Sequence, residues 1–130
     1  MLNVKIDTKE KFHVVTPIET SLSANMTAEL TPKMLELADG PVKNIILNMA
    51  NVSTLEIEAG ESLLKTQQQF YENSASFVIC ELTESAEQQL EEGGLLENMN
   101  TTPTESEAWD IVQMEEIERE LMDEWGDEEE

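Results

Sequence analysis

Two short apolar runs constrain the fold of this chain more than any other feature. Residues 45–47 read Ile-Ile-Leu, and residues 77–80 read Phe-Val-Ile-Cys. Continuous apolar runs of this length, bounded by polar turns, are typical of buried strands. Each run is followed by a turn and then by a segment with helical spacing, the first at residues 56–74 and the second after Thr83. Buried strands that alternate with helices predict an α/β domain with a mixed sheet and helices packed on it.

The N-terminal segment predicts a β-hairpin. Residues 2–8 alternate apolar and polar side chains, which is the period of a half-buried strand. Residues 9–11, Lys-Glu-Lys, form a polar turn. Residues 12–18 (FHVVTPI) are expected to form a second strand that pairs with the first as a hairpin.

The first helix is expected in the segment that follows, where Met26, Leu30, Met34 and Leu37 recur at helical spacing. Pro32 interrupts this pattern, because an interior proline removes a helix hydrogen bond. Two alternatives are open: the helix starts near Asn25 and bends, or it restarts with Thr31 as its cap and Pro32 at its first position. The pair Gly40 and Pro41 ends the helix.

The last helix has the clearest start signal. Thr104 and Glu107 form a capping box, and residues 99–104 before them are a connector or a short edge strand. An apolar stripe typical of a helix packed on a core follows, made of Ile111, Met114, Ile117 and Leu121. Together these segments predict about four to five strands and about four helices, in one domain at residues 1–121 with an acidic tail at 122–130.

The charge of the chain restricts its partners. The 130 residues carry 29 acidic and 7 basic side chains, a net charge of −22. Such a chain repels phosphate backbones and anionic membranes, so we expect no binding to nucleic acid or to membranes. A basic protein partner is compatible with this charge, and a solubilising surface is the simpler explanation.

The sequence predicts a cytoplasmic protein. The single cysteine, Cys80, cannot form an internal disulfide, which fits a reducing compartment. The first fifteen residues do not read as a basic leader followed by an apolar segment, and no stretch reaches the roughly 18 apolar residues of a membrane span.

The residues that would carry catalysis are isolated. His13 stands alone in a strand between Phe12 and Val14, so a zinc site is not expected. Cys80 lies inside an apolar run, which favours burial over nucleophilic chemistry. The two glycines of residues 91–97 lack the spacing and the lysine of a phosphate-binding loop. We therefore expect no enzyme activity, no metal and no cofactor.

Four segments in order resemble the STAS domain, the fold of bacterial anti-sigma factor antagonists. They are residues 12–30 (FHVVTPIETSLSANMTAEL), 42–64 (VKNIILNMANVSTLEIEAGESLL), 75–95 (ASFVICELTESAEQQLEEGGL) and 102–112 (TPTESEAWDIV). The resemblance covers about residues 2–120. It implies a STAS-like mixed sheet and a regulator that docks on an anti-sigma factor, often a serine kinase. That kinase phosphorylates a hydroxyl at the start of the second helix and so breaks the complex.

The phospho-acceptor loop of that family is altered in this chain. On the family's Asp-Ser-Ser-Gly-like turn, Glu56 falls at the aspartate, Ile57 and Glu58 fall at the two hydroxyl positions, and Ala59 falls at the glycine. The phospho-acceptor-equivalent position is therefore Glu58, which cannot be phosphorylated by this chemistry. The loop before the first helix also departs, with Thr20 where glycine is common and Ser23 where aspartate is common.

Three interpretations of Glu58 remain open. It is a carboxylate favoured by the helix dipole, worth about 0.3–1 kcal/mol. Alternatively, it is a permanent mimic of the phosphorylated state. In the third interpretation a neighbouring hydroxyl takes over the switch, at Ser53, Thr54 or Ser62.

The resemblance leads to two hypotheses of function. The first is a non-catalytic regulator that binds an anti-sigma factor or serine-kinase-like protein through what we call the switch-loop face: Ser23, Asn25, Ser53, Glu56, Glu58 and Ser62. The second is a scaffold subunit that has lost the switch and self-associates, as a homodimer, through a sheet edge or the last helix. At the end of that helix, Met122 and Trp125 either cap the core or contact a partner.

Overall fold

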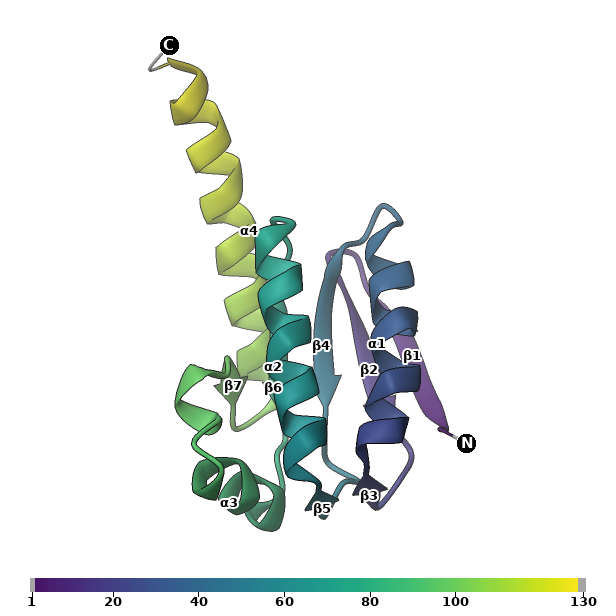
Figure 1. Cartoon of the computed structure of the whole chain (residues 1–130). Coiled ribbons are helices and arrows are strands. Elements are labelled where there is room, and N and C mark those ends of the chain that lie inside the picture. Colours follow the sequence, from purple (N-terminus) through teal and green to yellow (C-terminus); the bar gives the residue numbers. More distant parts are fainter. Residues whose placement is uncertain (1, 129–130) are drawn as a thin grey trace.

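The structure is a computed structural model that describes the backbone of residues 2–128 and the side chains up to Met122. A five-stranded sheet lies between helices on its two faces (Figure 1). In chain order the elements are β1 (Val4–Thr8), β2 (Phe12–Pro17), β3 (Ser21–Leu22), α1 (Ala24–Ala38), β4 (Asn44–Asn48), β5 (Thr54–Leu55), α2 (Ile57–Glu72), β6 (Phe77–Cys80), α3 (Glu84–Glu92), the 3₁₀-helix η1 (Leu96–Asn98), β7 (Thr101–Thr102) and α4 (Glu105–Glu128).

The sheet is mixed, as the sequence predicts. Its strand order is β1-β2-β4-β6-β7. The β1–β2 hairpin is antiparallel, and the remaining neighbours pair in parallel. β7 forms the short edge strand that was one of the two alternatives for residues 99–104. A second, two-stranded sheet of β3 and β5 was not predicted, because two residues are too few to show a periodic pattern.

The core has two parts, one on each face of the sheet. The larger part lies beneath α1, α2 and α3 and includes Leu30, Met34, Leu63 and Phe70. The smaller part lies beneath α4, where Ala108 and Val112 pack on five buried side chains of β2, β4 and β6: Phe12, Val14, Ile46, Val78 and Cys80. Trp109 closes this second part, with its ring 5.1 Å from that of Phe12.

The helix α1 runs without interruption through Pro32. The alternative in which the helix restarts with Thr31 as its cap is therefore wrong. Its first position is Ala24, and the Ser23 hydroxyl caps it by accepting a hydrogen bond from the Met26 amide. Pro32 is exposed, and so is Ala28, whose carbonyl the proline leaves without its helical donor. Water can serve that carbonyl, so the proline is tolerated on this face.

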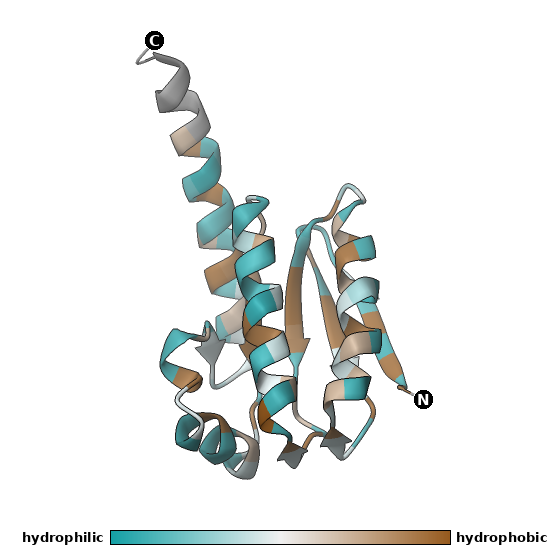
Figure 2. Ribbon diagram, in the orientation of Figure 1, coloured by the Kyte–Doolittle hydropathy of each residue, from teal (hydrophilic) through white to brown (hydrophobic). Residues whose placement is uncertain are grey.

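The apolar stripe of α4 does not face the sheet as predicted. Only Ile111 is half-buried, whereas Met114, Ile117 and Leu121 are all exposed. Figure 2 shows that brown, apolar bands alternate with teal, polar ones along α4. The buried positions of the helix are Ala108 and Val112, whose small side chains give a weak sequence signal. The stripe is thus present, but most of it lies on the outer side of α4.

Polar residues take the inner side of α4 instead, because the ends of β4 and β6 offer polar partners there. The only arginine of the chain, Arg119, donates to the Asn44 side-chain oxygen at 3.1 Å and to the Ser76 hydroxyl at 3.0 Å. The Ser76 hydroxyl donates to Glu115 at 2.6 Å. Asn44 also donates to Glu116 at 2.8 Å. We call this cluster the α4 anchor: Asn44, Ser76, Glu115, Glu116 and Arg119.

The ends of α4 differ partly from expectation. The Thr104 hydroxyl accepts a hydrogen bond from the Glu107 amide at 3.3 Å, as a capping box requires, but the Glu107 carboxylate bonds the same hydroxyl rather than the Thr104 amide. At the other end, the helix continues to Glu128, through most of the expected acidic tail. Met122 is exposed and does not cap the core. The side chain of Trp125 lies outside the described residues.

Candidate partner-binding face

The two loops that carry the switch-loop face are joined by the small β3–β5 sheet. Ser21 pairs with Thr54, and Leu22 pairs with Leu55. The amides of Ser53 and Thr54 both donate to the Thr20 carbonyl, at 2.8 and 3.1 Å. These bonds bring the starts of α1 and α2 to the same end of the molecule (Figure 1).

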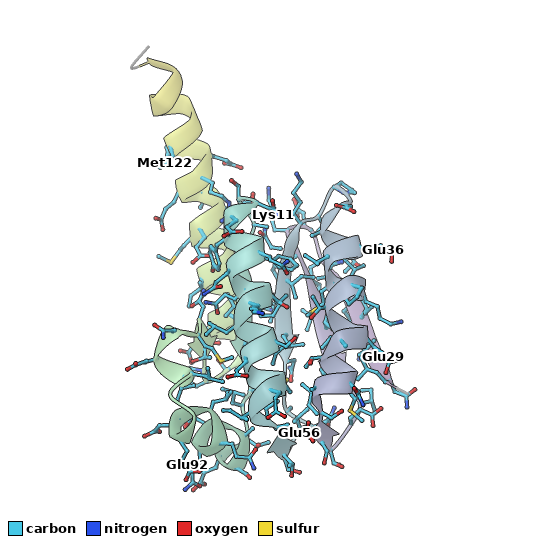
Figure 3. The ribbon with its side chains drawn as sticks, viewed as in Figure 1. Lys11, Glu29, Glu36, Glu56, Glu92 and Met122 are labelled. Carbon is cyan, nitrogen blue, oxygen red and sulfur yellow. The ribbon has the colours of Figure 1, made fainter. Side chains whose placement is uncertain are left out.

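Glu56 ties the two loops together through its side chain. It is the N-cap residue of α2, with an extended backbone, but its carboxylate makes no capping bond to its own helix. Instead, one of its oxygens accepts a hydrogen bond from the Ala24 amide, at the first position of α1, at 3.0 Å. The carboxylate at the family's aspartate position therefore serves the neighbouring helix. Figure 3 shows Glu56 at this end of the molecule.

Three residues of the predicted face are occupied in holding the loops. Besides Glu56, Ser23 caps α1. The hydroxyl of Ser53 donates to the Thr20 carbonyl at 3.2 Å. Substitution of any of the three perturbs the loop structure as well as any contact with a partner.

The other three residues have their functional groups available. Asn25 and Glu58 are exposed, Ser62 is half-buried, and none of the three side chains makes a hydrogen bond or ion pair to another described residue. Glu58 lies in the first turn of α2 and Ser62 one turn later, so both lie on the same side of the helix. They line a shallow hollow together with Glu61 and Lys65.

The helix α3 holds the loop before α2 through side-chain hydrogen bonds, and the sequence pattern did not reveal that role. The Gln89 side chain accepts a hydrogen bond from the Leu55 amide at 2.7 Å. The Thr83 hydroxyl, which also caps α3, donates to the Val52 carbonyl at 2.8 Å. Polar side chains that bond a distant backbone leave no periodic signal, so only the structure identifies them.

Two glycines set the distance between α2 and α3. A Cβ atom added at Gly60 would lie 2.8 Å from a Leu90 methyl and 2.9 Å from a Leu95 methyl. At Gly93 an added Cβ would lie 2.0 Å from the terminal methyl of Ile57. The Ile57 side chain, at the first of the family's two hydroxyl positions, therefore rests on the end of α3. Ile57 is still 40% exposed, so both residues of the pair reach solvent, and Glu58 is the one that carries charge.

The isolated histidine and cysteine have structural roles. His13 is buried, and its ring bonds the Thr8 hydroxyl at 2.8 Å and the Val42 carbonyl at 3.0 Å. Cys80 is buried, as predicted. Its burial, with the nearby carboxylates of Glu105 and Glu81, raises the pKa of the thiol to about 12. A thiol that stays protonated at neutral pH is a poor nucleophile.

Within the residues that the structure describes, no three His, Cys, Asp or Glu side chains are grouped so as to hold a metal ion. In that same part of the chain, none of the helices combines the length and the apolar character needed to cross a membrane.

Comparison with known proteins gives one family and several related folds. The model of the STAS domain matches residues 3–108. Among solved structures, the unphosphorylated form of the anti-sigma factor antagonist SpoIIAA is 17% identical, with a TM-score of 0.68 over 85% of this chain and 96% of that one. A Ser→Glu variant of RsbS from Moorella thermoacetica is also 17% identical, with a TM-score of 0.70 over 85% and 94%.

An anti-sigma factor antagonist from Mycobacterium paratuberculosis is 14% identical, with a TM-score of 0.70 over 87% of this chain and 95% of that one. Among curated proteins, none matches the chain. At these identities the structural matches concern the fold alone. The family match ends at Ala108, so most of α4 lies beyond it.

Proposed function

Since the chain belongs to the STAS domain family, we propose that it is a non-catalytic cytoplasmic regulator that binds a protein partner through the switch-loop face. The partner is an anti-sigma factor or a serine-kinase-like regulator. Binding does not depend on phosphorylation of a residue in the first turn of α2, because residues 56–61 contain no hydroxyl side chain.

The observation that carries this proposal is the position of Glu58. Its carboxylate is exposed in the first turn of α2 and has no partner among the described side chains. A phosphoserine carries a charge of about −1.5 to −2 at neutral pH, and a carboxylate carries part of that charge permanently. Glu58 itself cannot gain a phosphate, so the charge at this position does not change with the activity of a kinase.

The division of labour between the two carboxylates supports this interpretation. Glu56 accepts the Ala24 amide and stabilises the loop, whereas Glu58 makes no such bond. A carboxylate that makes no hydrogen bond or ion pair to another described side chain is available for a partner. With Glu61 beside it, it favours a partner that presents lysine or arginine at this contact.

The test is a binding experiment with three tagged baits: the wild type, Glu58→Ser and Glu72→Ser. Glu72 is an exposed glutamate at the far end of the same helix, so it controls for loss of charge. Each bait is incubated with lysate of the native host, with and without ATP, and bound proteins are identified by mass spectrometry.

We expect all three baits to capture a kinase-like anti-sigma protein when ATP is absent. With ATP, only Glu58→Ser is phosphorylated and released, since only it carries a hydroxyl at the acceptor position. Equal behaviour of the wild type and Glu58→Ser in ATP would contradict a role for Glu58 in the switch. The absence of any such partner from all three baits would overturn the proposed function.

A scaffold subunit that self-associates is the alternative function. The exposed part of the α4 stripe favours it, since exposed apolar side chains on a helix are typical of contact surfaces. Sedimentation at increasing concentration distinguishes the two functions, because a scaffold gains mass and a monomeric regulator does not.

A further inference from the structure

The outer side of α4 carries the largest exposed apolar side chains of the described part of this helix. Met114 is 59% exposed, Ile117 56%, Leu121 44% and Met122 69%. In a surface helix the apolar side normally faces the core. Here Ala108 and Val112 pack on the sheet early in the helix, the α4 anchor takes the inner side further along, and the four larger apolar side chains face solvent. This reversal is independent of the switch-loop face, which lies at the other end of the molecule (Figure 1).

The spacing of these residues is that of a helix that packs against another helix. Met114, Ile117 and Leu121 follow each other at intervals of three and four, the a-d-a pattern of a coiled-coil heptad. We call these three residues the outer stripe. In this register, the positions that flank the stripe and set partner choice carry Gln113, Glu118 and Glu120.

The size of the patch indicates a helix-sized contact. The three side chains of the outer stripe at these exposures offer on the order of 300 Å² of apolar surface, which is at the lower end of the range for the largest patch on a typical monomer. A stable protein interface buries about 800 Å² on each partner. The remaining contact must therefore come from the polar and charged residues at the flanks, and their sign decides the partner.

The charge at the flanks argues against a second copy of the chain. Between Glu105 and Met122 the helix has seven acidic side chains and one basic side chain, Arg119. Arg119 points inward and bonds Asn44, Ser76 and Glu116 in the α4 anchor. Two copies packed along the outer stripe would place Glu118 and Glu120 against glutamates. The basic side chains beside the stripe, Lys9 and Lys11 of the β1–β2 turn, already line a hollow with Glu120 of the same molecule.

We propose that the outer stripe of α4 is a docking surface for an amphipathic helix of another protein, whose apolar stripe is bordered by lysine and arginine. The apolar side chains supply the buried contact, and Glu118 and Glu120 select the basic helix. This makes the molecule a two-ended binder, with the switch-loop face at one end and the outer stripe at the other.

The test uses the full chain and two designed helical peptides of equal length. Both peptides have leucine at every a and d position; one has lysine at the e and g positions, and the other has glutamate there. Binding is followed by the amide NMR spectrum of the full chain, which reports both the affinity and the residues affected. Three protein variants complete the set: Met114→Gln/Ile117→Gln/Leu121→Gln, Glu118→Lys/Glu120→Lys, and Glu84→Lys/Glu87→Lys on α3 as the matched charge control.

We expect the lysine peptide to bind about ten-fold more tightly than the glutamate peptide and to shift the amides of residues 111–122. The triple glutamine variant should lose binding without a change in net charge. The Glu118→Lys/Glu120→Lys variant should prefer the glutamate peptide, whereas the α3 control should keep the wild-type preference.

Three results would overturn the proposal. The first is equal affinity for the two peptides. The second is a set of amide shifts at residues 53–62 in place of α4. The third is self-association of the wild type that the triple glutamine variant abolishes, which would assign the stripe to a second copy. None of these results changes what is expected when the wild type and Glu58→Ser capture a partner with and without ATP. The failure of one proposal can therefore be distinguished from the failure of the other.

Discussion

Asn44 joins α4 to the sheet from the buried side of the α4 anchor. It is 3% exposed, and its amide uses all four hydrogen-bonding positions. The oxygen accepts from the Ser76 amide at 2.7 Å and from Arg119 at 3.1 Å. The nitrogen donates to the Lys11 carbonyl at 2.9 Å and to Glu116 at 2.8 Å. We predict that Asn44→Leu destabilises the fold by about 3 kcal/mol.

The magnitude comes from the exposure of each partner. The Ser76 amide is in a fully buried residue, so losing its acceptor costs about 1–3 kcal/mol. The side chains of Arg119 and Glu116 are 24% and 31% exposed, so water replaces part of what they lose, and each lost bond costs about 0.5–1 kcal/mol. The total is a large fraction of the roughly 5–15 kcal/mol that holds a domain together.

The measurement is urea unfolding followed by circular dichroism, with Arg119→Met as the matched variant. Arg119→Met removes the charged donor but keeps the Ser76 amide paired, so it should cost about 1–2 kcal/mol, less than Asn44→Leu. Hydrogen exchange at the Ser76 amide should speed up in Asn44→Leu only. If Asn44→Leu costs less than about 1 kcal/mol, or if the Ser76 amide stays protected, the buried amide is not the source of the stability.

Three further predictions concern pH, packing and the two glutamates. Burial and the neighbouring Glu115 raise the pKa of Tyr71 to about 12, and burial with Glu105 and Glu81 raises that of Cys80 to about 12. Since both groups lose their protons more readily in the unfolded chain, these two groups should leave the urea midpoint unchanged below pH about 9 and lower it as the pH rises toward 12; Tyr71→Phe and Cys80→Ala should each remove part of that slope. Gly60→Val should cost about 2 kcal/mol or more in urea unfolding, because the valine side chain would meet Leu90 and Leu95. Gly40→Ala should be near neutral, because the nearest heavy atom would lie 3.4 Å from the added Cβ, an ordinary contact distance. Glu56→Ala should lower stability by about 1 kcal/mol through loss of the cap on α1, and Glu58→Ala by less than about 0.5 kcal/mol; the opposite order would show that the loop is held by Glu58.

Much of the fold could be predicted from the sequence, because the strands of the sheet centre are continuous apolar runs. β4 and β6 lie where residues 45–47 and 77–80 predict them. The caps at Thr83 and Thr104 also follow from local chemistry. These signals are local, and a local signal survives in a single sequence.

The side of α4 that packs on the sheet could not be predicted from the sequence. Periodicity shows that a helix has an apolar side, but it does not show what that side contacts. Its true contact positions, Ala108 and Val112, are small, and the competing outer stripe is larger. The same limit applies to the switch-loop face. The spacing of Glu56 and Glu58 is visible in the sequence. Only the structure shows that the Glu56 carboxylate caps α1 and that the Glu58 carboxylate has no partner among the described side chains.

The bond from the Ala24 amide to Glu56 spans 32 positions of the chain, and this has a consequence for the order of folding. During synthesis, α1 emerges with Ser23 as its only side-chain cap. At about 5–20 residues per second, the carboxylate that completes its first turn is added a few seconds later. We therefore expect the start of α1 to become fixed together with the β3–β5 pair and the start of α2. Because Glu56 is synthesised after α1, we expect the starts of α1 and α2 to form as a single cooperative unit.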